Sequence, residues 1–461
     1  MSAATEPSGG RFRGLRVAVG DPRRQVRIVA ALIVVTIVYA FLYNDLRQGA
    51  LKPLFETLPF PSVNTLIIMC YYAILALGLN IVVGFAGLLD LGYVAFYVFG
   101  AYTTAFLASP LHDIHMPWWI VVWIAVMVAA LAGVLLGAPT LRLRGDYLAI
   151  VTLGFGEILP DLARNLGEID LSFIGGPKDF NLTAGPIGVN PIDPPIIPIP
   201  DFIGSALGGL GIDVGDALVF SNLNPVASFY LILVLLLIVF GVCVRLRDSR
   251  LGRAWMAIRE DETAAASMGI DTVSTKLLAF GLGASFSGFT GAFFGAYSTA
   301  IFPDSFSFAV SISILIMIVL GGMGSLRGAV VGAFAIRYLS DELLPYLGGF
   351  VDEPVRSVGS ALPEIPILTQ RLEAFTLTSY NFLLYGVILI LMMLYRPEGL
   401  LPVATRKAEL HGEGVAAEST FGTADEVAEA ATAYEASIHD LEAGTPGALS
   451  PDSDDERRSG P

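Results

Sequence analysis

The chain has 461 residues, of which 54% are hydrophobic and 15% charged, with a mean hydropathy of +0.68 and a formal net charge of −15. This is more apolar material than a soluble core of that size can hide, which excludes a soluble globular protein. Both cysteines, Cys70 and Cys243, lie inside long apolar runs, which excludes a disulfide framework and a cysteine metal cluster.

Residues 1–25 form an arginine-rich segment that precedes the first apolar run. The combination resembles a secretory signal, but Asn44, Asp45 and Leu46 follow the run where small residues would mark a cleavage site. We therefore expect a retained first helix, with cleavage as the lesser alternative.

Apolar runs along the chain predict an all-α fold, a polytopic transmembrane helical bundle of about ten helices within residues 26–400. The expected helices are at residues 26–43, 62–83, 88–108, 118–138, 147–163, 227–245, 276–299, 308–322, 326–344 and 380–395. Several of them are shorter than the roughly 20 residues of a full span. The glycines at 321–324 predict either a turn or a re-entrant break.

Basic residues in the connecting segments predict the orientation, because they resist translocation. Arginines gather before the first helix, after the fourth helix and in the segment 245–275. Ten alternating helices would place all three groups on the cytoplasmic side, together with both termini. The long segments 164–226 and 345–379 then become external loops, while Arg47 and Lys52 in the loop 44–61 are exceptions.

The C-terminal segment 401–461 carries 13 acidic and 4 basic residues and is rich in alanine, glycine and serine. Such a composition buries too little apolar surface to fold alone, so we expect a largely disordered cytoplasmic tail. Residues 424–441 could form a transient helix. A solvated extension is favoured over a docking or regulatory role.

No phosphate-binding loop, zinc-binding HExxH pair or GxSxG nucleophile elbow occurs in the sequence, so an enzyme is not expected. We also expect no cofactor, no metal and no nucleic-acid partner. Asp90 and Glu157 are the carboxylates that fall near or within predicted spans, where they need a partner or a wet cavity. For Glu157, function and structural pairing are equally favoured. Asp90 could instead be a helix N-terminal charge at the interface.

The soluble segment RLRDSRLGRAWMAIREDETAAASMGID at 245–271 predicts a short helix on the cytoplasmic side. Trp255, Ile258 and Glu262 share one face of that helix, whereas Arg253 presents charge elsewhere. A mixed surface of this kind favours docking of a soluble partner. A basic helix that lies on anionic lipid is the alternative.

From about Leu75 to Pro402 the sequence resembles the LivM-type permease subunits of ABC importers for branched-chain amino acids. The resemblance is carried by GFAGLLDLGYVAFYVFGAYT at 84–103, LRLRGDYLAIVTLGFGEI at 141–158, NLTAGPIGV at 181–189, GGMGSLRGAVVGA at 321–333 and LYRPEGLLP at 394–402. It implies a multi-pass protein of the cell membrane without ATPase activity of its own.

The resemblance also implies partners and site residues. The partners are two ATP-binding cassette ATPase subunits, a second permease of the LivH type, an external substrate-binding protein and membrane lipid. In such permeases an EAA-type loop couples to the ATPase. Ala264, Ala265 and Gly269 keep its spacing, but Thr263 occupies the glutamate position and Glu262 precedes it. The expected ATPase-coupling residues are Arg253, Trp255, Ile258, Glu262, Ala264, Ala265 and Gly269. The candidate passage-lining residues are Gly84, Gly87, Asp90, Gly92, Tyr93 and Glu157.

The expected cargo is leucine, isoleucine or valine, since glycine-lined apolar helices favour such solutes over charged ones. Related permeases that carry urea or short amides share much of the pattern, and that alternative remains open. An ion-coupled secondary carrier of small neutral solutes, which would need no ATPase, is a further alternative from another class. A membrane scaffold is the least favoured.

Overall fold

The computed structural model describes residues 38–40, 42–43, 58–140, 145–167, 181–198, 217–360 and 376–401. The predictions for residues 1–25, for most of the first helix and for nearly all of the tail 401–461 lie outside these ranges. So do parts of the segments 164–226 and 345–379.

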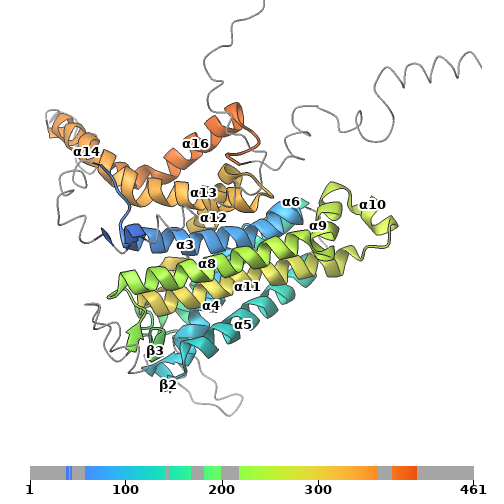
Figure 1. Ribbon diagram of the computed structural model, residues 1–461, viewed down its shortest axis with the longest axis horizontal. Coiled ribbons are helices and arrows are strands. Elements are labelled where there is room, and N and C mark those ends of the chain that lie inside the picture. Colours follow the sequence, from blue (N-terminus) through green and yellow to red (C-terminus); the bar gives the residue numbers. More distant parts are fainter. Residues whose placement is uncertain are drawn as a thin grey trace, which may run out of the picture. The chain divides into compact units, whose positions relative to one another are not determined.

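The described residues are mainly helical (Figure 1). The main helices of the bundle are α3 (Val63–Leu79, continued by the π-helix Asn80–Phe85), α4 (Val94–Leu107), α5 (Trp118–Thr140), α6 (Gly145–Asn165), α8 (Pro225–Asp248), α11 (Thr272–Ser298), α12 (Phe308–Gly321), α13 (Leu326–Tyr338) and α16 (Asn381–Tyr395). Each predicted helix from 62–83 onward therefore has a helical counterpart. Within the described ranges, six helical segments are long and apolar enough to cross a membrane: Val63–Phe85, Trp118–Thr140, Pro225–Asp248, Thr272–Ser298, Pro303–Gly321 and Leu377–Tyr395.

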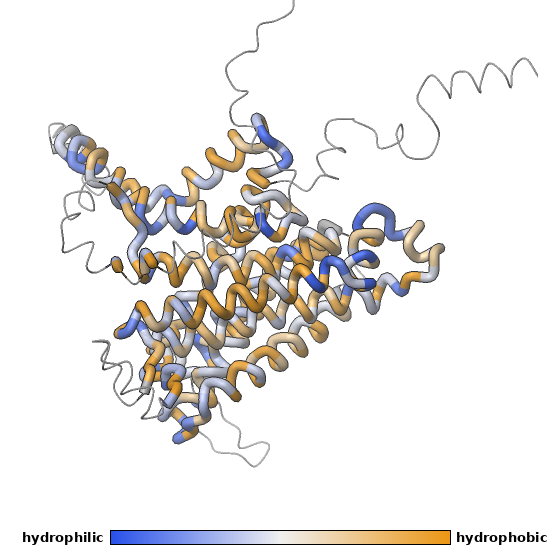
Figure 2. Tube along the Cα trace, viewed as in Figure 1, coloured by the Kyte–Doolittle hydropathy of each residue, from blue (hydrophilic) through white to orange (hydrophobic). Residues whose placement is uncertain are grey.

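Two helices occupy the middle of the bundle. Almost all of α3 is buried, and it packs against α8, α11, α12 and α13. In α16, by contrast, only Tyr385 is buried. The long helix α11 packs most extensively against α5 and α4 (Figure 1). Apolar residues dominate these helices, and hydrophilic residues gather in the α9–α10 region (Figure 2).

Small residues bring α5 and α11 together as an antiparallel pair. Ala125, Ala129, Gly133 and Gly137 recur every four residues on α5 and form one stripe along the helix. A Cβ atom added at Gly133 would lie 2.6 Å from the Cβ of Ala284 on α11. Such close approach depends on small side chains and provides the van der Waals contact that holds helices together in lipid. We call these residues, with their partners on α11, the small-residue seam.

Helix α13 continues further than the sequence predicts. The π-helix Leu339–Leu343 leads directly from α13 into α14 (Leu344–Ser360), so the expected loop 345–379 begins as helix. The sequence obscured this helix because Gly348, Gly349 and Pro354 are breakers and the segment is amphipathic rather than apolar. At 321–324 the structure contains a turn, as one of the two predictions had it, with positive φ at Gly322 and Gly324.

Loop segments pack together at the end of the bundle where α4 and α11 finish, and we call this the loop end. Two antiparallel strand pairs lie there: β1 (Ala108–Ser109) with β2 (Ile114–His115), and β3 (Ile196–Pro198) with β4 (Ala217–Val219). Backbone hydrogen bonds from Val189, Ile192 and Asn222 tie the described parts of 164–226 to residues 297–301. These parts of the loop therefore pack over the ends of the helices and are hydrogen-bonded to them.

Candidate functional site: an anchored loop and a polar helix face

Helix α9 (Arg250–Glu260) begins where α8 ends and turns back onto the bundle. Ser249 caps it by accepting a hydrogen bond from the backbone N–H of Gly252 at 3.2 Å. A Cβ at Gly252 would lie 2.2 Å from the carbonyl oxygen of Arg247, so only glycine permits this tight turn.

The predicted face of α9 points inward. Trp255 is fully buried, and its indole Nε1 donates a hydrogen bond to the carbonyl oxygen of Thr275 at 2.8 Å. Ile258 is 5% exposed. Trp255 anchors α9 to the start of α11, and both side chains are turned into the protein instead of presenting a surface to a partner.

Arg259 makes a second anchor that the sequence analysis missed. Its Nη1 donates to the carbonyl oxygen of Gly84 at 2.5 Å, at the π-helical end of α3. Gly87, with φ of +71°, lies directly against the Arg259 side chain, where a Cβ would approach Arg259 Cγ to 2.8 Å. Asn80 Oδ1 accepts from the backbone N–H of Gly324, which joins the same place to the α12–α13 turn. The sequence feature that could have indicated this anchor is the pair of glycines at positions 84 and 87.

The short helix α10 (Glu262–Ser267) projects beyond α9. Asp261 caps it by accepting from the backbone N–H groups of Thr263 and Ala264, at 2.8 and 3.0 Å. Glu262 pairs with Lys276 at 2.5 Å, and Ala265 is 4% exposed against the bundle. At the base of α11, hydrogen bonds from Ser274 hold the pKa of Asp271 below its usual range.

Residues 261–264 and 266–269 are exposed at the outer part of this element. Ala264 is exposed, Met268 is 85% exposed, and Gly269 has a φ of +85° with open space around it. We call Ala264, Met268 and Gly269 the tip. Arg253 is exposed on α9 and bonds to the carbonyl oxygen of Asp248. The element therefore combines an anchored base with an accessible end of small residues and one large apolar side chain, Met268.

Most of the candidate passage residues are packed in the bundle. Tyr93 is fully buried, and its hydroxyl donates to the carbonyl oxygen of Gly283 at 2.9 Å. A Cβ at Gly92 would lie 1.9 Å from the carbonyl oxygen of Thr152, which brings the 90–92 turn onto α6. Asp90 is 1% exposed, and its Oδ1 accepts from the backbone N–H of Gly92. Gly84 and Gly87 belong to the Arg259 anchor.

Glu157 differs from the other candidates because it is exposed. It lies on α6 beside the exposed Ile158, and a Cβ at the nearby Gly154 would meet no atom within 4 Å. We call Gly154, Glu157 and Ile158 the open face of α6. An ionised carboxylate is costly in hydrocarbon, which makes lipid a poor neighbour for this face.

Within the described residues there is no group of three or more His, Cys, Asp or Glu side chains that could hold a metal ion. The bundle and the anchored α9–α10 element define a multi-pass helical membrane protein with closely packed helices and a projecting pair of short helices. The sequence model of the family described as branched-chain amino acid transport system / permease component matches residues 62–393. The chain belongs to this family.

Named relatives agree with that assignment. The chain is 36% identical over 419 residues to the high-affinity branched-chain amino acid transport system permease protein LivM of Salmonella typhimurium, covering 89% of this chain and 82% of the relative. It is 37% identical over 396 residues to LivM of Escherichia coli K12, covering 85% and 78%. LivH of the same E. coli strain is 32% identical over 118 residues, or 24% of this chain and 38% of the relative. No solved structure gives a significant match.

Proposed function

We propose that the chain is a permease subunit of an ABC importer in the cell membrane and that it carries branched-chain amino acids. It would work with a second, LivH-type permease, two ATPase subunits and an external binding protein. The proposal is supported by membership of the permease family and by the extent of the similarity to LivM proteins. No step of ATP hydrolysis is assigned to this chain.

The observation that carries the proposal is the anchored α9–α10 element. A tip made of Ala264, Met268 and Gly269 can enter a cleft on an ATPase, while Trp255 and Arg259 transmit the movement into α11 and α3. Met268 is a large apolar side chain exposed among small and polar residues, and a cleft on the ATPase would remove it from water. Lipid-surface binding is less well supported, because the apolar face of α9 is already buried in the bundle.

The loop end, at the opposite end of the bundle from the α9–α10 element, provides a surface for the binding protein. Leu223 is 95% exposed and Ile187 is 82% exposed, although both lie in segments that hydrogen bonds hold in place. Ordered loops that present large apolar side chains favour specific docking over random contact.

One pair of variants tests both surfaces reciprocally. We expect Met268→Asp to reduce co-purification of the ATPase subunits at least about tenfold, since a charge buried at an interface without a partner costs several kcal/mol. Leu223→Asp should instead weaken docking of the binding protein and leave the ATPase bound. Each variant is the control for the other. Loss of both partners in either variant would indicate misfolding, and loss of neither would contradict the assigned surfaces.

The open face of α6 is the part of the described bundle that we assign to the passage, or to the second permease beside it. Glu157→Leu discriminates this assignment from a lipid contact. If residue 157 faces lipid, the substitution should raise the thermal stability of the protein and leave uptake unchanged, because it removes a costly charge from hydrocarbon. If residue 157 lines a wet passage, the same substitution should lower the uptake of labelled leucine several-fold while the expression level stays unchanged. The first result would remove α6 from the passage.

Uptake measurements in cells test the cargo and the energy source. Labelled leucine should enter in a chain-dependent way, and labelled urea should not. Inactivating the ATPase subunits should stop uptake, whereas collapsing the proton gradient at a maintained ATP level should not. Urea uptake would favour the amide carrier, and the opposite energy dependence would favour a secondary carrier.

A further inference from the structure

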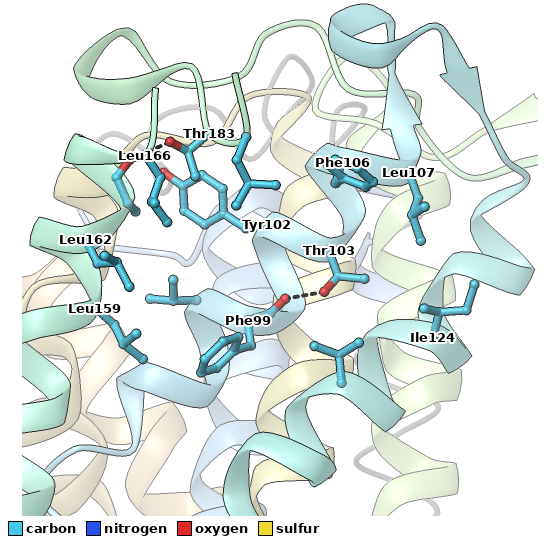
Figure 3. Close-up of a pocket in the computed structure, with 14 residues that line it drawn as sticks. Phe99, Tyr102, Thr103, Phe106, Leu107, Ile124, Leu159, Leu162, Leu166 and Thr183 are labelled. Carbon is cyan, nitrogen blue, oxygen red and sulfur yellow. Dashed lines mark hydrogen bonds between the residues drawn. The ribbon is translucent and has the colours of Figure 1, made fainter. Parts of the chain in front are cut away.

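A cavity of about 390 Å³ lies at the loop end between α4, α5 and α6 (Figure 3). This volume is within the range of about 300–1,000 Å³ that is typical of small-molecule sites. Its walls are aliphatic and aromatic side chains, with Phe99 and Phe106 from α4, Ile124 from α5, and Leu159 and Leu162 from α6. A backbone hydrogen bond from Leu182 to the carbonyl oxygen of Leu166 joins α6 to the loop beside it.

The cavity offers almost no free polar group. The hydroxyl of Thr103 donates to the carbonyl oxygen of Phe99 at 2.6 Å, and that of Thr183 donates to the carbonyl oxygen of Ala163 at 2.7 Å. The hydroxyl of Tyr102 is buried and has no hydrogen-bond partner among the described residues. An apolar ligand group would fill such a space, and one polar atom at its edge would satisfy Tyr102.

Charged groups lie at the α6 end of the cavity, where Ala163 next to Arg164 is part of the lining. Arg164 bonds to Asp161 at 2.6 Å and to Asp304 at 2.5 Å. All three charged side chains are open to solvent. A guanidinium can take a carboxylate, and the two aspartates can take an ammonium. We call Asp161, Arg164 and Asp304 the charged rim.

We propose that this cavity is a transient site for the aliphatic side chain of an incoming amino acid, whose ammonium and carboxylate groups are held at the charged rim. The inference rests on the proposed function and deepens it. The combination is complementary to a zwitterion with a branched apolar side chain. A lipid acyl chain could fill the cavity, but the rim has two negative groups and one positive group, and so opposes an anionic headgroup.

The site adjoins the open face of α6. Leu159 and Leu162 line the cavity, while Glu157 and Ile158 on the same helix point outward. A solute that enters from the loop end would therefore meet the cavity before it reaches the depth of Glu157. The cavity would select for aliphatic side chains after release from the binding protein.

The first test narrows the cavity in the assembled transporter. Leu162 is 44% exposed, so Leu162→Trp can be accommodated without disturbing the core. We expect it to lower leucine uptake about tenfold, through lost burial of the aliphatic group, and to affect alanine uptake less. The matched control is Leu135→Trp on α5, at a position that is 63% exposed and lies away from the cavity. Equal leucine uptake by the two variants would overturn the proposal.

The second test detects occupancy directly. Both native cysteines are buried, so Thr103→Cys in the purified complex provides a thiol in the cavity for a water-soluble thiosulfonate reagent. Leucine or valine should slow its labelling at least about threefold, and glycine should not, because only the former bury an aliphatic side chain. Ile197→Cys, at a position that is 40% exposed at the loop end, should be labelled at the same rate throughout.

The outcomes separate this inference from the proposed function. If leucine uptake is normal but leucine does not change the labelling rate of Thr103→Cys, the cavity site is overturned and the proposed importer function stands. Labelling that responds to the acyl-chain length of added lipid, but not to leucine, assigns the cavity to lipid and also overturns the site. Absence of leucine uptake by the unmodified complex contradicts the proposed function itself.

Discussion

Gly100→Ala is expected to destabilise the bundle by about 1–3 kcal/mol or more, because an added methyl group has no space at the α4–α11 crossing. A Cβ at Gly100 would lie 2.1 Å from the carbonyl oxygen of Gly288 and 2.6 Å from its Cα. These are backbone atoms, so no side chain can rotate away to make room. The two helices must separate, and the contacts of Tyr97 and Ala101 with Gly291 are lost with them.

Thermal unfolding of the purified protein in detergent measures this loss. Gly241→Ala on α8 is the matched control, because a Cβ there meets no atom within 4 Å. The control should be as stable as the unmodified protein, or more stable by up to about 1 kcal/mol from the higher helix propensity of alanine. Similar unfolding temperatures for the two variants would contradict the close approach of α4 and α11.

Trp255→Ala is expected to uncouple the α9–α10 element from the bundle while the protein still inserts into the membrane. The substitution removes a fully buried side chain and its hydrogen bond to Thr275, a loss of about 3–5 kcal/mol for a large aromatic residue. That cost falls on the docking of α9, since the spans themselves are unchanged. Arg259 then has no rigid helix from which to reach Gly84.

Leucine uptake and ATP hydrolysis by the reconstituted complex should separate in this variant. Hydrolysis should continue, because the tip is still present, whereas uptake should fall about tenfold or more as movement no longer reaches α3 and α11. Met256→Ala is the control, since Met256 is 36% exposed on the outer side of the same helix. Full uptake by Trp255→Ala would show that the buried anchor is dispensable for coupling.

Hydropathy predicted a helix at each apolar run from 62–83 onward, because lipid imposes a simple rule on long apolar segments. Six helical segments of the described residues are long and apolar enough to be membrane spans. Hydropathy predicted α14 poorly because of the same rule. That helix is amphipathic and contains Pro354 in its interior, so neither its composition nor its breakers distinguish it from a loop. The folded chain supplies what the sequence lacks, since α14 continues from α13 through a π-helical turn.

The α9–α10 element shows a different limit. The spacing of Trp255 and Ile258 correctly indicated one apolar face, but a partner and the bundle would each bury such a face. Only the fold distinguishes them, by placing Thr275 within hydrogen-bond distance of the indole. The charged rim was beyond prediction, since Arg164 and Asp304 are 140 positions apart and meet through the packing of separate segments.

The small-residue seam has a consequence for motion in the bundle. With side chains reduced to methyl groups and hydrogens, α5 and α11 touch along much of their length, and Trp118 is bonded to the carbonyl oxygen of Ala292 at one end. Such a pair should behave as one stiff rod, with amide hydrogens that exchange only on global unfolding. The amides of α6, which packs less extensively against its neighbouring helices, should exchange earlier than those of this pair.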